Sequence, residues 1–147
     1  MSKMSTKSRA VSAKGVIEYR FHIPRTLVTG SHINCADNSG AKMLNLVNVV
    51  GYKGRLKRMP AACVGDMTVV SVTRGSPDLR KSVFRAILIR QHKPYRRPDG
   101  SWIQFEDNAA VIITPEGELR GSEIRGPVAR EAAERWPRVA AAASIIV

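Results

Sequence analysis

Two apolar runs joined by an Asp-Gly turn restrict the fold of this chain more than any other feature. The first run begins at Ala86, the second ends at Ile112, and the stretch between them is cationic. Asp99-Gly100 between such runs is a strong hairpin signal, because type I′ turns need positive φ at both central residues. We therefore expect a rigid hairpin that holds its cations in position to bind a polyanion, of which RNA is the obvious candidate. Its tip carries Lys93, Tyr95, Arg96 and Arg97.

The rest of the body has the pattern of short β-strands separated by turns. The turns are rich in Gly, Pro, Asn and Asp, which tolerate or preset turn dihedrals. Residues 67–73 are β-branched with partial alternation, as in a half-buried strand. Short strands at this spacing predict a small closed barrel, which removes exposed sheet edges. The candidate strands are residues 26–35, 41–50, 67–73, 85–91, 102–105 and 109–114.

The last thirty residues change character and predict two short helices. Gly126-Pro127 puts a proline where a helix can begin, since its missing N–H costs nothing in the first turn. Glu131 and Arg135 have the i,i+4 spacing of a favourable ion pair. Pro137 ends or kinks this helix, and an Ala-rich second helix follows. The residues that share one face of the first helix are Val128, Ala132 and Trp136.

Charge is distributed unevenly along the 147 residues, whose net charge is +12. Residues 42–97 hold thirteen Lys and Arg against two carboxylates, whereas residues 98–147 hold five against eight. A basic body of this kind predicts an anionic partner, most often nucleic acid. The C-terminal third is mildly acidic and suits a protein partner better.

The chain fits one domain after a basic extension. We expect residues 1–26 to be that extension and residues 27–147 to be the domain, with barrel and ribbon in 27–121 and helices in 122–147. Residues 1–15 weakly resemble a transit peptide, but a solvated tail that orders on RNA is the commoner meaning beside a basic domain.

The cations of the basic body gather in three segments. One lies between glycines and a proline, one flanks a later loop, and one tips the hairpin. Lys and Arg bind phosphates and fix register, while Tyr52, Tyr95 or Trp102 can stack on unpaired bases. The predicted RNA-binding residues are Lys53, Arg55, Lys57, Arg58, Arg74, Arg80, Lys81, Arg85, Lys93, Tyr95, Arg96 and Arg97.

The chemistry of a cofactor, metal or membrane protein is not indicated. Cys35 and Cys63 have no second pair for a metal site, so we expect buried free thiols in a reducing compartment. His22, His32 and His92 lack metal-ligand spacing and triad partners. The longest apolar stretch is too short to cross a bilayer, and no secretory signal is present. We expect no cofactor, no membrane and no small-molecule substrate.

Three blocks of the sequence are similar to one known family. They are residues 33–42, the hairpin with Asp99-Gly100, Phe105 and Asn108, and residues 121–131. Together they resemble the universal large-subunit ribosomal protein called L-fourteen in bacteria and L-twenty-three in older eukaryotic naming. The likeness runs from about Leu27 to about Ala142. Residues 54–62 and 136–139 resemble the archaeal and eukaryotic branch, which indicates a cytosolic ribosome.

The resemblance implies a five-stranded barrel with a projecting ribbon and a small helical region. It also implies binding to large-subunit rRNA near the sarcin–ricin loop, contact with small-subunit rRNA across an intersubunit bridge, and contact with neighbouring ribosomal proteins. An anti-association factor docks on the C-terminal side of eukaryotic members. The location implied is the cytoplasm, with assembly in the nucleolus if the source is eukaryotic. The predicted protein-contacting residues are Arg120, Arg125, Arg130 and Glu134.

Both ends depart from the family pattern. Residues 1–26 differ from the glycine-rich start common in this branch, and residues 18–24 have no evident counterpart. The usual small polar ending is replaced by Ile145, Ile146 and Val147. We expect these tails to make lineage-specific contacts.

Three functions are compatible with these sequence features. The first is a structural RNA-binding constituent of the large subunit, without catalysis. The second is a free-standing nucleic-acid chaperone or translation factor. Proteins that bind single strands usually interleave several aromatic residues on one face, and this chain has only eight aromatic residues in all, which weakens this hypothesis. The third is an RNA-processing enzyme that uses the carboxylates of Glu106 and Asp107. Strand neighbours point to opposite faces, so a turn-and-strand role is favoured for this pair.

Overall fold

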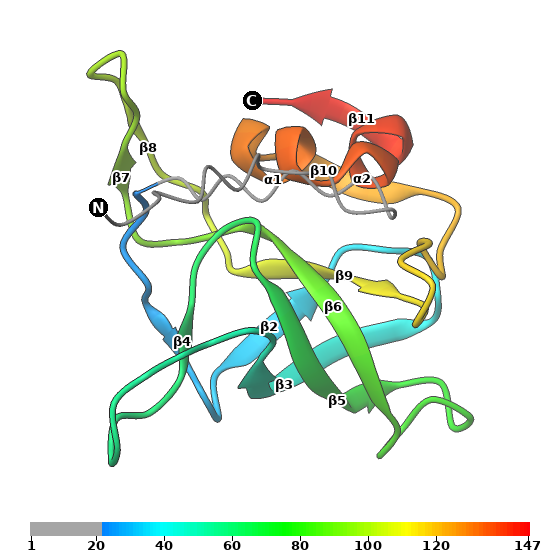
Figure 1. Ribbon diagram of the computed structural model, residues 1–147. Helices are drawn as coiled ribbons and strands as arrows, with labels where there is room; N and C mark the ends of the chain where they lie inside the picture. Colours follow the sequence, from blue (N-terminus) through cyan, green and yellow to red (C-terminus); the bar gives the residue numbers. More distant parts are fainter. Residues whose placement is uncertain (1–21) are drawn as a thin grey trace, which may run out of the picture.

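A closed barrel of five strands forms the centre of this computed structural model, which describes residues 22–147 (Figure 1). Neighbouring strands pair antiparallel, except where β2 and β9 pair parallel through Asn34–Ala109 and Cys35–Ala110 and close the barrel. The predicted fold class is therefore confirmed. In barrel order the strands are β2 (His32–Cys35), β3 (Ala41–Val49), β5 (Met67–Gly75), β6 (Val83–Arg90) and β9 (Ala109–Ile113).

Strand β9 and residues 86–90 of β6 are buried on both faces. Ala86 and Leu88 of β6 point into the barrel, whereas Ile87 and Ile89 point outward against a second core. All five residues of β9 are likewise buried. This double burial explains the continuous apolar runs, because a strand with one wet face alternates instead. Strand β5 shows that alternation, as predicted for residues 67–73.

A C-terminal layer covers the outer face of β6 and β9 and forms the second core with them (Figure 1). Trp136, which the sequence places on one face of the first helix with Ala132, is 7% exposed and lies in this core. Two short helices are present as predicted, and Pro137 begins the second one. The layer consists of β10 (Ile124–Val128), α1 (Arg130–Arg135), α2 (Pro137–Ala142) and β11 (Ala143–Ile146).

The prediction that Pro127 begins a helix was wrong. Pro127 lies in β10 and is in register with Ile145 of the parallel strand β11, and α1 begins only at Arg130. The Pro127 carbonyl also accepts a hydrogen bond of 2.9 Å from Arg90 of the barrel. These tertiary bonds, which local spacing does not reveal, hold the segment extended.

A two-stranded ribbon projects from the barrel beside the C-terminal layer, formed by β7 (Tyr95–Arg96) and β8 (Trp102–Ile103) (Figure 1). The predicted type I′ turn was wrong in detail. Gly100 has φ of +91°, but Asp99 is not among the described residues with positive φ. Arg97 N bonds Ser101 O at 2.8 Å, and Gly100 N bonds Arg97 O at 3.0 Å. This is a three-residue loop with one left-handed glycine.

The predicted strand at residues 26–35 is split by a turn. Its first part is β1 (Leu27–Val28), which pairs with β4 (Ala61–Ala62), and its second part is β2. Gly30, with φ of +89°, makes the turn between them. Most of the expected extension, residues 1–21, lies outside the described residues. No helix within residues 22–147 has the length and apolar character needed to cross a membrane.

Candidate nucleic-acid interface

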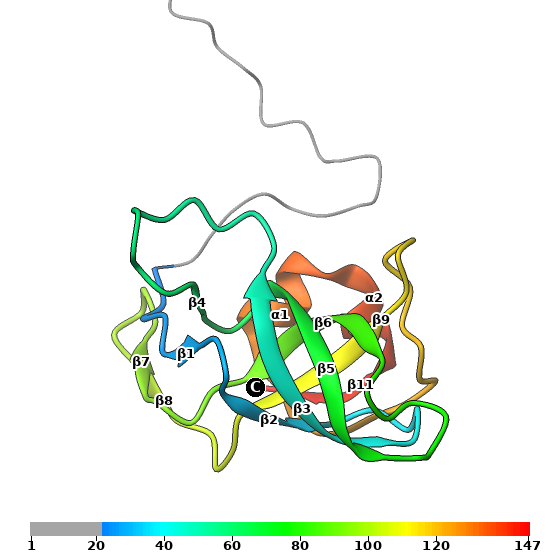
Figure 2. The same cartoon turned by 90° about the horizontal axis from the view of Figure 1, so that it is seen from below.

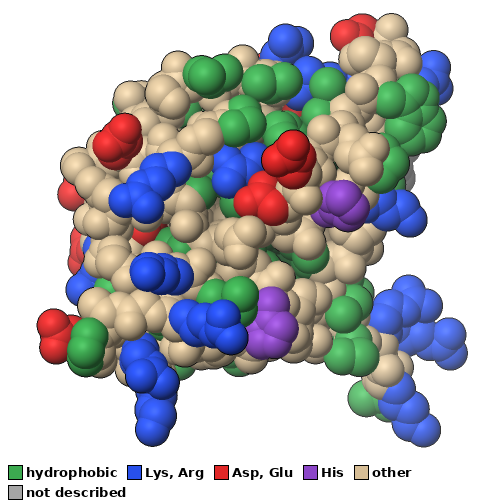
Figure 3. All heavy atoms as spheres, turned by 180° about the vertical axis from the view of Figure 1, so that it is seen from behind, with side chains coloured by type: hydrophobic (Ala, Val, Ile, Leu, Met, Phe, Trp, Pro, Cys, Tyr) green, Lys and Arg blue, Asp and Glu red, His purple; other side chains and the backbone are tan. Residues whose placement is uncertain are grey.

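Ten of the twelve predicted RNA-binding residues are exposed, and only Tyr95 and Arg97 are buried. The exposed ones occupy three places and do not form one patch. Figures 1 and 2 both show the loop of residues 51–60 and the β7–β8 ribbon on one side of the barrel and the β5–β6 loop on the opposite side. In the view from behind, Lys and Arg side chains project from the lower edge (Figure 3). An anionic partner must extend around the barrel to meet all three.

Ion pairing separates the cations into two classes. Within residues 22–147, the arginines that form ion pairs are Arg90, Arg97, Arg135 and Arg138. The pairs of Arg97 and Arg135 use buried carboxylates and connect the C-terminal layer to the ribbon and to the barrel. Arg90 pairs with Asp107 beside the barrel, and the Arg138 pair with Glu118 is exposed. The ten exposed candidate cations therefore have no ion-pair partner among the described residues. Their charge remains available to phosphates of an external ligand.

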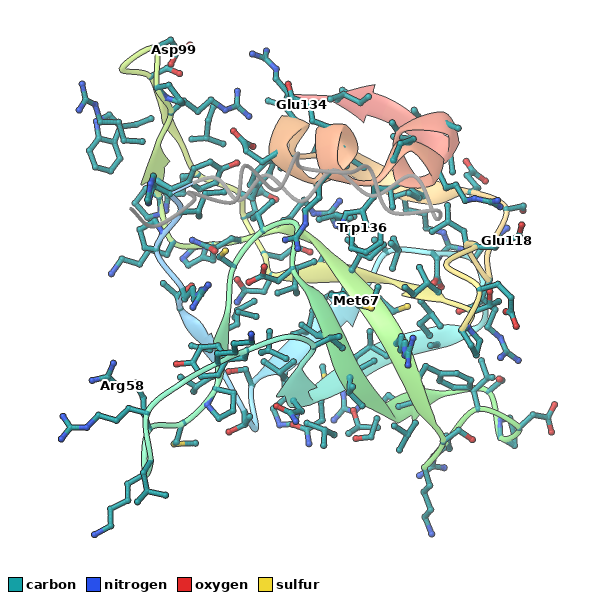
Figure 4. All side chains as sticks on the ribbon, viewed as in Figure 1. Arg58, Met67, Asp99, Glu118, Glu134 and Trp136 are labelled. Carbon is teal, nitrogen blue, oxygen red and sulfur yellow. The ribbon has the colours of Figure 1, made fainter. Side chains whose placement is uncertain are left out.

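The first basic loop is anchored at its base and exposed at its tip. Tyr52 is half-buried, the Arg25 guanidinium lies 5.4 Å from its ring centre, and a Cβ at Gly54 would lie 2.3 Å from the ring. Tyr52 therefore serves to hold the loop, and its predicted stacking on RNA bases is not supported by this geometry. Arg58, labelled in Figure 4, projects away from the barrel.

The second basic loop joins β5 to β6. Lys81 is one of two non-glycine residues with positive φ in the described part of the chain, at +65°, and its N–H bonds Val72 O at 3.0 Å. Lys42, which sequence reasoning did not select, is exposed at the start of β3, and its neighbour Ala41 pairs with Gly75 at the other end of this loop. The β3–β5 pairing, once predicted, would have identified Lys42.

The ribbon has one wet face and one buried face. Arg96 and Trp102 are paired across the strands and are exposed, Trp102 by 67%. Tyr95 and Arg97 lie on the other face and are 1% and 8% exposed. Direct RNA contact by these two, as predicted, is incompatible with their burial in this structure. The period of two along a strand accounts for the split.

One buried carboxylate binds both inner residues of the ribbon. The Tyr95 hydroxyl donates to Glu131 Oε2 at 2.7 Å, and Arg97 Nε donates to Oε1 at 2.7 Å. Burial, and next the Glu131 carboxylate, raise the pKa of Tyr95, so its hydroxyl stays protonated and donates. Arg97 Nη2 also donates to the Val147 carbonyl at 2.6 Å. These bonds tie the ribbon to α1 and to the C-terminal strand.

Arg96→Ala is expected to leave the fold intact while weakening RNA binding. Arg96 is exposed and has no ion-pair partner in the described part of the chain, so the free energy of unfolding should change by less than about 0.5 kcal/mol. Loss of one phosphate contact should reduce the slope of log K for RNA against log salt concentration by about one. Urea unfolding and binding titrations at several salt concentrations measure both. A large loss of stability would show that Arg96 has a structural role.

The carboxylates of Glu106 and Asp107 do not act as a pair. Both residues lie in a bend between β8 and β9, and Glu106 is exposed. Asp107 is bound by Arg90 Nε at 2.9 Å and by Asn34 at 3.2 Å. Although burial opposes it, these bonds lower the pKa of Asp107, so its carboxylate stays ionised. This gives Asp107 a structural partner and no proton to donate near neutral pH.

Arg90 also joins the barrel to the C-terminal layer. Its Nη1 donates to the carbonyls of Arg125 and Pro127, at 3.0 and 2.9 Å. Gly126, between those residues, has φ of +80°, and a Cβ there would lie 2.8 Å from the same Nη1. Only glycine leaves room for the guanidinium and adopts this φ without strain.

The predicted pair between Glu131 and Arg135 was wrong. Glu131 faces the ribbon, whereas Arg135 donates to Asp66 at 3.0 Å and to the Gly65 carbonyl at 3.0 Å. Trp136 Nε1 donates to the same carbonyl at 2.8 Å. Both helical side chains therefore bind the barrel and not each other, because buried partners outside the helix offer stronger bonds than a solvated pair.

The two cysteines are free thiols, as expected; Cys63 is buried as predicted, whereas Cys35 is only half-buried. Burial, then the Asp37 charge, raises the pKa of Cys35 to about 12, and burial and Asp66 raise that of Cys63 to about 12. Both thiols therefore stay protonated near neutral pH, and a protonated thiol is a poor nucleophile. We expect maleimide to label neither cysteine in the native protein and both in urea, as read by mass spectrometry. Fast native labelling would contradict this burial.

The predicted protein-contacting residues are all exposed but do not form one cluster. Arg130 and Glu134 share the outer face of α1, where Glu134 is labelled in Figure 4. Arg120 instead lies over the Phe84 ring of β6, 4.8 Å from its centre. Arg125 lies on β10. Among residues 22–147, no group of three or more His, Cys, Asp or Glu is arranged to hold a metal ion.

Comparison with known proteins gives one consistent result. The model of the family described as ribosomal protein L14p/L23e matches residues 26–147. A protein of Thermoplasma volcanium named large ribosomal subunit protein uL14 is 61% identical over 123 residues, covering 84% of this chain and 93% of that protein. A protein of Pyrobaculum aerophilum with the same name is 55% identical over 133 residues, or 89% of this chain and 92% of that protein.

A third relative bears on the N-terminal segment. The protein named large ribosomal subunit protein uL14 from Thermofilum pendens is 54% identical over 147 residues, which is 100% of both chains. The alignment therefore includes residues 1–26, for which the sequence alone suggested no counterpart at residues 18–24.

Proposed function

Since this chain belongs to the ribosomal protein L14p/L23e family and is a structural constituent of the large ribosomal subunit, we propose that its exposed loop cations bind the RNA of that subunit. The RNA site we propose lies near the sarcin–ricin loop, at the face that meets the small subunit. The contacting residues are the ten exposed members of the predicted set and Lys42.

The separation between paired and unpaired cations carries this proposal. The three arginines with mostly buried side chains, Arg90, Arg97 and Arg135, are each matched with a carboxylate. Within residues 22–147, the exposed loop cations of the predicted set are not. Because the unpaired cations lie at separate corners of the barrel, we infer that the RNA passes around the molecule and contacts several sides. Phosphates are recognised by position and shape in this mode, without a base code.

The C-terminal layer is proposed as the protein-facing side. It belongs to the C-terminal third of the chain, residues 98–147, where eight carboxylates face five Lys and Arg. Arg130 and Glu134 offer charges of both signs on the outer face of α1. Neighbouring ribosomal proteins and an anti-association factor are the partners we propose for it. We also propose a contact with small-subunit rRNA across an intersubunit bridge. The archaeal sources of the relatives support a cytoplasmic location for the assembled subunit.

Tethered hydroxyl-radical probing tests the RNA site. Iron chelates attached at Val83→Cys, beside the second basic loop, and at Glu134→Cys, on α1, use exposed positions in a protein whose own thiols are hard to modify. We expect cleavage of large-subunit rRNA near the sarcin–ricin loop from Val83→Cys and weaker cleavage there from Glu134→Cys.

The same probes test the bridge. Cleavage of small-subunit rRNA is expected only in joined ribosomes. Absence of any cleavage around the sarcin–ricin loop from labelled protein within large subunits would overturn the proposed site, while leaving membership of the subunit untouched.

A further inference from the structure

The tip of the first basic loop is a tight turn with an unusual backbone. Arg58 N donates to Arg55 O at 3.0 Å, so Leu56 and Lys57 are its two central residues. Lys57 has φ of +66°. Positive φ at the third residue of such a turn is normally provided by glycine or asparagine, and lysine adopts it at a cost in free energy.

This turn presents an apolar side chain to solvent. Leu56 is 88% exposed, more than any other large hydrophobic residue in the described part of the chain, and Met59 in the same loop is 57% exposed. A single exposed apolar residue is ordinary, but two at the tip of one loop mark a contact surface when the surroundings agree.

The surroundings of Leu56 are cationic. Arg55, Lys57 and Arg58 flank it, and residues 51–60 contain no carboxylate. The nearest carboxylate along the chain, Asp66, is 2% exposed and bonds Arg135. The apolar Leu56 side chain, flanked by these cations, complements a surface that is apolar at its centre and anionic around it. Nucleobases flanked by phosphates have that character.

We propose that Leu56 contacts bases of the rRNA as an apolar wedge, while Arg55, Lys57 and Arg58 bind the phosphates on either side of it. Leu and Met are among the residues that proteins insert at base steps. The left-handed Lys57 fixes the turn that keeps Leu56 outward, and Tyr52 fixes the base of the loop. This inference rests on the proposed function, since it assigns part of the RNA contact to one loop.

Substitutions at Leu56 separate a wedge from a purely electrostatic loop. Leu56→Ala removes the side chain without changing charge, and Leu56→Lys adds a cation. A loop that acts by charge alone predicts unchanged binding for the first variant and tighter binding for the second. The wedge predicts that both variants bind an in vitro transcript of the sarcin–ricin domain about tenfold more weakly, because they lose the burial of a leucine side chain. For Leu56→Ala the salt dependence of binding should stay unchanged.

Val83→Lys is the matched control. Val83 is also an exposed apolar residue, at 60%, and lies beside the other basic loop. Adding a cation there should leave affinity unchanged or raise it. Since both positions are exposed, urea unfolding should show native stability for all three variants, which excludes misfolding as the cause of weaker binding.

The occupant is identified by a photoreactive diazirine amino acid at position 56 in assembled large subunits. Cross-linking to rRNA supports the wedge. Cross-linking only to a neighbouring protein, or tighter transcript binding by Leu56→Lys, overturns it while the proposed RNA-binding function stands. If the unmodified protein itself fails to bind the transcript in low salt, the proposed function fails, and the wedge fails with it.

Discussion

Replacing Glu131 with alanine is expected to lower the free energy of unfolding by about 3–5 kcal/mol, because it leaves a buried guanidinium without its counter-ion. Arg97 and Glu131 have side chains that are 8% and 6% exposed, and their Nε–Oε1 distance is 2.7 Å. The Tyr95 hydroxyl loses its acceptor in the same variant. Urea unfolding measures the loss, and hydrogen exchange should locate the faster amides in residues 95–103.

Glu134→Ala is the control on the same helix. Its side chain is exposed, so the free energy of unfolding should change by less than about 0.5 kcal/mol. Arg97→Ala should also be destabilising, and the double variant with Glu131→Ala should lose less than the sum of the single losses, by about 1–3 kcal/mol. Equal, small effects for Glu131→Ala and Glu134→Ala would show that the ribbon is held by other contacts.

Removing the three cations of the first basic turn is expected to weaken rRNA binding about a hundredfold near 0.1 M salt. Each phosphate contact contributes roughly 0.7–0.9 to the slope of log K against log salt, so at about 0.1 M each lost contact lowers log K by about that amount. The variant is Arg55→Ala, Lys57→Ala and Arg58→Ala together. The slope of log K against log salt should fall by about two to three. Binding titrations between about 50 and 200 mM salt measure affinity and slope together.

A charge-matched variant controls for net charge alone. Arg120→Ala, Arg125→Ala and Arg130→Ala also removes three exposed cations, none of them in the predicted RNA-binding set and two of them in the C-terminal layer. Its affinity for the transcript should fall by less than about threefold, as for weak long-range attraction. Equal losses for the two triple variants would mean that the RNA responds to total charge and that no face is preferred.

The barrel strands could be predicted because the local pattern of apolar residues reflects which faces of each strand are buried. The apolar runs of β6 and β9 correspond to strands buried on both faces, and the alternation of β5 corresponds to a strand buried on one. Strand β10 was missed because its extended form depends on a parallel neighbour and on Arg90, both remote in sequence.

The exposed cations of the candidate interface could also be predicted from the sequence, but the burial of Tyr95 and Arg97 could not. Arg96 and Arg97 are adjacent, so both were assigned to the RNA, although strand alternation alone would have separated them. The contact between Glu131 and the ribbon could not be inferred from the sequence. The i,i+4 spacing of Glu131 and Arg135 instead indicated a pair within α1. Charge density in a sequence identifies a basic surface, but only packing shows which cations are already neutralised.

Sedimentation of tagged protein through gradients of cell lysate tests most directly whether the loop cations hold this chain in the large subunit. The unmodified protein should migrate with free large subunits and whole ribosomes and be released only by high salt. The variant lacking the cations of Arg55, Lys57 and Arg58 should shift toward the top of the gradient at lower salt. Unmodified protein at the top of a low-salt gradient, or a variant that stays on the subunit as firmly as the unmodified protein, would contradict the account.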